Sequence, residues 1–122
     1  MNIENRTINI NRGDSGNILL KVPISSTEFY QFITGDKVQF RIFNKGDYST
    51  PIKTKEVDIS SNTTEVTIPL TELETTLGEI IDKPKTYWYE ISLNEDKTLV
   101  GYDSTDGAAE LILLPGYVEE GV

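Results

Sequence analysis

The chain has 122 residues, which is enough for one domain with its own hydrophobic core. Its 20 acidic and 11 basic residues give a formal net charge of −9, which argues against nucleic acid or an anionic membrane as a partner. The chain contains no cysteine and no histidine, so disulfides and the commonest general base and metal ligand are excluded.

The first strands are predicted from alternating apolar and polar residues. Thr7–Asn11 is expected to be a short strand, and Ile18–Ile24 a longer one whose even-numbered residues face inward. A packed connection over Ser25–Thr34, with one helical turn, leads to a strand at Lys37–Asn44. The outward-facing residues of that strand include Gln39, Arg41 and Phe43.

Two further strands are predicted in the middle of the chain. Lys53–Ile59 carries lysines that suit a solvated sheet edge, and Glu65–Leu70 alternates around three apolar residues. The four polar residues Ser60–Thr63 separate the two strands. This spacing predicts that the two strands form a hairpin.

A short helix is expected at residues 71–78. Thr71 and Glu74 have the spacing of a capping box, in which each side chain bonds the other residue's backbone N–H. Leu73 and Leu77 lie four residues apart and are expected to share one helical face. The helix would cross one end of the folded domain.

The segment Thr86–Leu93 has the strongest strand pattern and is predicted to be the central strand. Four residues fall on its inward face: Tyr87, Tyr89, Ile91 and Leu93. Trp88 and Glu90 fall on the opposite face.

Two strands complete the predicted fold. Thr98–Tyr102 follows a hairpin turn, and Glu110–Leu114 is apolar on both faces, so it is either buried on both sides or covered by a partner. The pattern of about eight short strands and one short helix predicts a single immunoglobulin-like β-sandwich domain over residues 1–122.

The sequence shows no catalytic constellation, so we expect neither enzyme activity nor a cofactor. The tripeptide Arg12-Gly13-Asp14 matches the sequence that integrins recognise, but its glycine also suits an ordinary turn, which is the interpretation we favour.

Acidic residues in two turns are a possible calcium site. These are Glu95, Asp96, Asp103 and Asp106. Their spacing does not match an EF-hand loop, so we interpret them as solvated turn residues and predict no metal site.

Trp88 and Phe43 are candidates for an interface. If their strands are neighbours, the two rings form an aromatic patch beside Arg41 and Glu90 on the outer face of the sheet. Alternatively, the Ser25–Thr34 connection or the helix folds over both rings and makes them a second small core.

The order of these elements resembles the N-terminal immunoglobulin-like domain of phage baseplate upper proteins. The matching features include Gly13-Asp14, the apolar strand Ile18–Ile24, Gly35–Phe40, Tyr87–Ile91 and the closing strand Glu110–Leu114. The resemblance brings no catalytic residues.

This resemblance implies a virion or prophage structural module that docks to other tail or baseplate proteins and forms oligomers around the tail axis. The N-terminal sequence MNIENRTINI lacks the basic and apolar regions of a signal peptide, so we expect assembly in the bacterial cytoplasm. The alternative is a carbohydrate- or cell-surface-binding β-sandwich. Its stacking platforms would be Trp88, Tyr87, Tyr102 and Tyr48.

Overall fold

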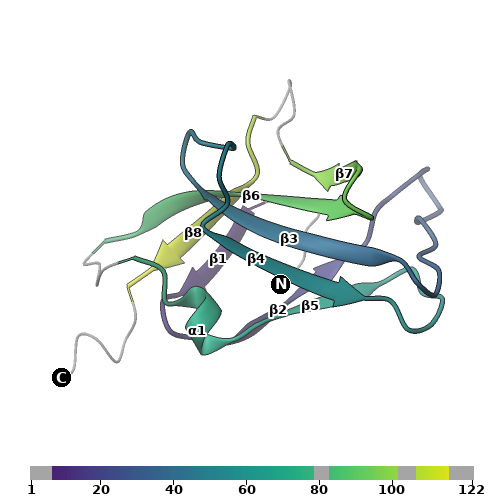
Figure 1. The fold of residues 1–122 in the computed structure, drawn as a ribbon, viewed down its shortest axis with the longest axis horizontal. Coiled ribbons are helices and arrows are strands. Elements are labelled where there is room, and N and C mark those ends of the chain that lie inside the picture. The colour runs from purple at the N-terminus through teal and green to yellow at the C-terminus, as the bar shows by residue number, and fades with distance from the viewer. Residues whose placement is uncertain (1–6, 79–82, 102–106, 116–122) are drawn as a thin grey trace.

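The computed structural model describes residues 7–78, 83–101 and 107–115 (Figure 1). This part of the chain is all-β, with eight strands and one short helix, as predicted. The strands are β1 (Thr7–Asn11), β2 (Gly16–Leu20), β3 (Lys37–Asn44), β4 (Lys53–Asp58), β5 (Val66–Leu70), β6 (Lys85–Leu93), β7 (Lys97–Val100) and β8 (Glu110–Leu114). The helix is α1 (Glu72–Thr75), and no helix in the described residues is long and apolar enough to cross a membrane.

The strands form two sheets that pack into a sandwich. The larger sheet has the order β1-β8-β6-β3-β4, and β7 pairs with β6. β1 and β8 are parallel, whereas the other neighbours in this sheet are antiparallel. The smaller sheet is the antiparallel pair β2–β5, which lies below β3 and β6 in Figure 1.

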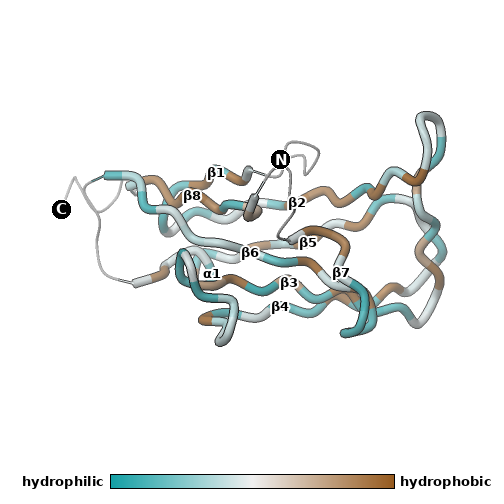
Figure 2. The backbone as a smooth tube through the Cα atoms, turned by 90° about the horizontal axis from the view of Figure 1, so that it is seen from above, coloured by the Kyte–Doolittle hydropathy of each residue, from teal (hydrophilic) through white to brown (hydrophobic). Residues whose placement is uncertain are grey.

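The core lies between the two sheets and is built mainly from alternate residues of β1, β2, β3, β5, β6 and β8, an alternation that can be followed in Figure 2, whereas β4 and β7 add only partly buried residues. The four residues predicted to face inward from the central strand β6 are all buried. The ring of Tyr89 stacks on Phe40 of β3, with 5.4 Å between centroids. The prediction of a central aromatic strand is therefore confirmed.

β2 is shorter than predicted, because the chain turns back on itself after Leu20. Pro23 forms an isolated bridge with Phe29, and the N–H of Ile24 donates to the carbonyl of Glu28 at 3.0 Å. Ile24 is consequently 61% exposed instead of facing inward. The predicted helical turn in this connection is also wrong, since its residues form bends and bridges.

The predicted hairpin of β4 and β5 is wrong. β4 pairs with β3 in the larger sheet, and β5 pairs with β2 in the smaller one. The connection is fixed to the core on its way between the sheets, because Thr63 and the fully buried Phe32 exchange backbone hydrogen bonds of 2.8 and 3.0 Å. The chain therefore crosses from one sheet to the other here.

The helix is half as long as predicted. Its capping box is present, with hydrogen bonds between Thr71 and Glu74 in both directions. The chain leaves helical geometry at Thr76, so the spacing rule for one helical face does not extend to Leu77. Leu77 is buried, whereas Leu73 is 80% exposed, and the prediction that they share a face is wrong.

Candidate protein-interaction face

The four residues predicted as interface candidates lie together on the outer face of the larger sheet. Phe43 of β3 is directly opposite Trp88 of β6, and Arg41 is directly opposite Glu90. The two strands are thus neighbours, which is the condition on which the aromatic patch depended. A role for these residues as an interface remains a prediction.

Tyr48 completes an aromatic cluster with Phe43 and Trp88. Its ring centroid lies 5.1 Å from that of Phe43 and 5.0 Å from that of Trp88. Phe43 is only 3% exposed as a result, so it does not belong to an open patch, whereas Trp88 and Tyr48 are half-buried. A small second cluster thus forms. The ring that packs on Phe43 and Trp88 comes from the β3–β4 loop, and not from the Ser25–Thr34 connection or the helix that the alternative named as their cover.

The β3–β4 loop holds Tyr48 in place through its own hydrogen bonds. Gly46 has a φ of +87°, a conformation that favours glycine, and the N–H of Asp47 donates to the carbonyl of Asn44 at 3.0 Å. The Asp47 carboxylate accepts hydrogen bonds from the hydroxyl and the N–H of Ser49. These bonds lower the pKa of Asp47, the hydroxyl having the larger effect.

A chain of polar contacts runs from this cluster along the outer face. Arg41 forms an ion pair with Glu90 at 3.4 Å, and both side chains are 25% exposed. Arg41 also donates to the Oε1 atom of Gln39, which is itself buried. Gln39 in turn donates from Nε2 to Glu56 at 3.1 Å and to Glu95 at 3.3 Å. The charged groups beside the aromatic cluster are thus fixed in place before any partner arrives.

The outer face continues onto β8, which carries apolar residues on both sides. Leu111 and Leu113 are buried in the core, whereas Ile112 and Leu114 point outward and are half-buried. Trp88 lies on the neighbouring strand β6, directly opposite Glu110 of β8. Half-exposed apolar groups therefore extend over two adjacent strands of the larger sheet.

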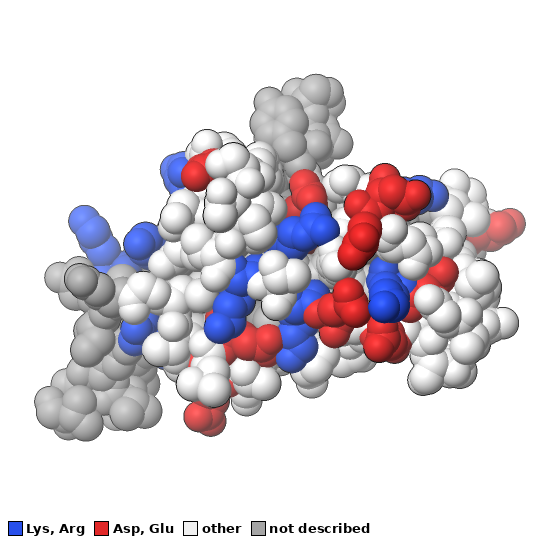
Figure 3. Space-filling view, viewed as in Figure 1, with Lys and Arg blue, Asp and Glu red and all other residues white. Residues whose placement is uncertain are grey.

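Charges of both signs are intermixed on the side of the molecule formed by β3 and β4 (Figure 3). Lys37 and Glu56 form an exposed ion pair at 3.7 Å, and Lys55 of β4 forms a partly buried ion pair with Glu74 of α1 at 2.9 Å. In the described part of this face the basic side chains therefore lie among carboxylates, unlike the basic stripe that tracks a phosphate backbone.

The turn containing Arg12, Gly13 and Asp14 is part of the scaffold, as we favoured. Arg12 is only 8% exposed, and its guanidinium donates to the carbonyls of Leu77 at 3.1 Å and Gly78 at 2.7 Å. A buried arginine that holds the end of another element cannot serve an external receptor. No local pattern in the sequence indicates this anchoring role, because the two carbonyls lie 65 and 66 residues further along the chain.

The remaining candidates are the acidic turn residues and two of the possible stacking residues. No group of three or more acidic residues in the described ranges could hold a metal ion. Asp103, Asp106 and the possible stacking residue Tyr102 lie outside the described residues. Tyr87 is buried in the core, so its prediction as a stacking platform is wrong.

The chain is thus an all-β sandwich with a half-exposed aromatic and apolar outer face on its larger sheet. Comparison with family models, with curated proteins and with solved structures finds no match.

Proposed function

We propose that this chain is a non-catalytic module that docks to other proteins through the outer face of its larger sheet. The observation that carries the proposal is the position of Trp88, which is half-exposed on the central strand, lies opposite Phe43 of β3 and packs against the ring of Tyr48. Aromatic residues and arginine are enriched at the centres of protein interfaces, and Arg41, held by its ion pair with Glu90, lies beside Trp88 on the same face.

We further propose that the fold is immunoglobulin-like. The order β8-β6-β3-β4 corresponds to the G-F-C-C′ order of a variable-type immunoglobulin sheet, and the pair β2–β5 corresponds to its strands B and E. This correspondence supports the resemblance to the phage baseplate upper protein domain.

The resemblance leads to a specific biological setting. The module would be a structural protein of a phage or prophage tail or baseplate, assembled into the virion in the bacterial cytoplasm. Its partners would be other tail proteins or further copies of itself around the tail axis. The half-exposed residues Ile112 and Leu114 would extend the contact surface from Trp88 across β8.

A carbohydrate-binding function has less support. Tyr48 packs against Trp88 and therefore does not offer a separate platform for a sugar ring. Two open hollows lie elsewhere on the described surface, one beside Leu73 and one between β4 and β5, and neither is lined by an aromatic residue.

The test is the solution mass measured by light scattering after size-exclusion chromatography. We expect the wild-type chain to form a trimer or larger ring, and Trp88→Ala to dissociate it. Phe29→Ala is the matched control, because Phe29 is a partly exposed aromatic residue on the β2–β3 connection.

If the wild type is monomeric, the same variants are measured for binding to the tail proteins encoded beside it. Equal binding by the wild type and by Trp88→Ala would contradict the proposed docking face.

A further inference from the structure

A second surface lies apart from the aromatic cluster, where β2 begins and β5 ends. An open groove of about 660 Å³ runs over this end of the small sheet and reaches α1. Gly16 and Asn17 of β2 line it together with Pro69 and Leu70, their partners in β5. Leu73 of α1 forms its end, and we name it the Leu73 groove.

Leu73 is the most exposed of the large apolar side chains in the described ranges, at 80%. The capping box fixes this arrangement, because it holds Thr71 and Glu74 in place on either side of Glu72 and Leu73. Leu73 is therefore presented to solvent on an ordered turn, with the apolar residue Pro69 nearby in the groove.

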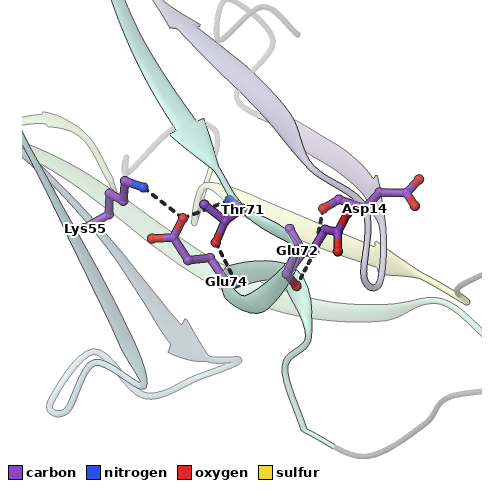
Figure 4. Close-up of polar contacts among 6 residues, drawn as sticks. Asp14, Lys55, Thr71, Glu72 and Glu74 are labelled. Atoms are coloured by element: carbon purple, nitrogen blue, oxygen red, sulfur yellow. Dashed lines mark hydrogen bonds and ion pairs between the residues drawn. The ribbon is translucent and has the colours of Figure 1, made fainter.

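Two carboxylates lie beside the groove. Glu72 lines it, and Asp14 directly precedes the lining residue Ser15. The Thr75 hydroxyl lies within hydrogen-bonding distance of both backbone carbonyls, 2.6 Å from that of Asp14 and 3.2 Å from that of Glu72, and so keeps the two backbones close together (Figure 4). Both residues are exposed, and neither carboxylate forms an ion pair or hydrogen bond within the described residues. Glu74, by contrast, is paired with Lys55.

We propose that the Leu73 groove binds a short segment of a partner protein in which an apolar side chain stands next to a lysine or arginine. The apolar side chain would pack against Leu73 and Pro69, and the basic group would lie between Asp14 and Glu72. A second copy of this chain is the alternative occupant, and the test below distinguishes it from a basic partner segment. The proposal is independent of the outer aromatic face, which uses other elements.

The test uses the full chain and three synthetic peptides. GKLKIG combines basic and apolar residues, GKSKSG lacks the apolar ones, and GELEIG has the opposite charge. Binding is followed through the backbone amide signals in ¹H–¹⁵N NMR spectra. We expect GKLKIG to shift the signals of Gly16, Asn17 and Leu73, and the other two peptides to bind at least about tenfold more weakly.

Two variants give a matched comparison. Leu73→Ser removes the exposed apolar group from the groove, and Ile24→Ser removes a similarly exposed apolar group from another loop. We expect Leu73→Ser to weaken GKLKIG binding about tenfold and Ile24→Ser to leave it unchanged. Both positions are exposed, so both variants should fold, and the dispersion of the NMR spectrum checks this.

Three results would overturn the proposal. The first is that GKLKIG causes no shifts, or shifts mainly residues away from the groove. The second is equal binding of GKLKIG and GELEIG, which would remove the role of Asp14 and Glu72. The third is that the groove signals shift with protein concentration in the absence of peptide, which would identify a second copy as the occupant.

Discussion

Replacing Arg12 with alanine tests whether the β1–β2 turn holds the segment that follows α1 in place. The guanidinium donates to two backbone carbonyls, of Leu77 and Gly78, and is 8% exposed. A hydrogen bond from a charged donor contributes roughly 1.5–3 kcal/mol, and water can replace part of the bond to the exposed Gly78. We therefore expect Arg12→Ala to lower the free energy of unfolding by about 2–4 kcal/mol.

Urea unfolding followed by the fluorescence of Trp88 measures this loss. With a urea dependence of about 1.5 kcal/mol per molar, a loss of 3 kcal/mol lowers the midpoint by about 2 M at an unchanged slope. Arg12→Lys retains the charge but has one nitrogen in place of the two that donate to Leu77 and Gly78, so we expect about half of the loss in free energy of unfolding. The exposed Lys45→Ala serves as control. A loss below about 1 kcal/mol for Arg12→Ala, or one equal to that of the control, would refute the anchoring role.

Three further predictions concern stability. Tyr48→Ala should lower the free energy of unfolding by about 1–2 kcal/mol and shift the fluorescence emission of Trp88 to longer wavelength, because the ring that packs on Trp88 is removed. Unchanged emission would contradict this packing. Burial by itself would raise the pKa of Glu74, but hydrogen bonds from Lys55 and Thr71 outweigh it and lower the pKa. Folding therefore stabilises the ionised form, and Glu74→Gln should lower the free energy of unfolding by about 1 kcal/mol at neutral pH. The difference from the wild type should disappear as acid protonates the carboxylate, because glutamine can still form the capping box. A difference that persists in acid would contradict the role of the ion pair. Phe32→Ala should cost about 3–5 kcal/mol in urea unfolding, because the side chain is fully buried; a loss below about 2 kcal/mol would show that the connection does not belong to the core.

The parts of the fold that could be predicted are those that depend on the alternation of residues within a single strand. The alternation of aromatic and polar residues in β6 fixes which face is buried, and this phase places Trp88 outside and Tyr89 inside. The same reasoning for β3 places Phe43 on the outer face, so two of the three rings of the aromatic cluster could be predicted from the sequence.

The errors lie where the outcome depends on contacts between distant segments. β4 and β5 are separated by a turn-like sequence that suits a hairpin, but the hydrogen bonds between Phe32 and Thr63 direct the chain to the other sheet. Tyr48 lies in a loop without periodicity, so no local pattern indicates that its ring packs on Trp88. Hydrogen bonds from Arg12 to the segment after α1 likewise connect residues far apart in the chain.

The measurement that tests the docking proposal most directly is lysine cross-linking and mass spectrometry of purified phage particles from an induced host. We predict that the chain is present in the particles and that Lys45, in the loop that carries Tyr48, cross-links to other tail proteins or to further copies of the chain. Lys21, which pairs with Glu65 near the far end of the small sheet, serves as the internal comparison. Absence of the chain from the particles would contradict the virion role, and cross-links from Lys21 alone would contradict the outer aromatic face as the docking surface.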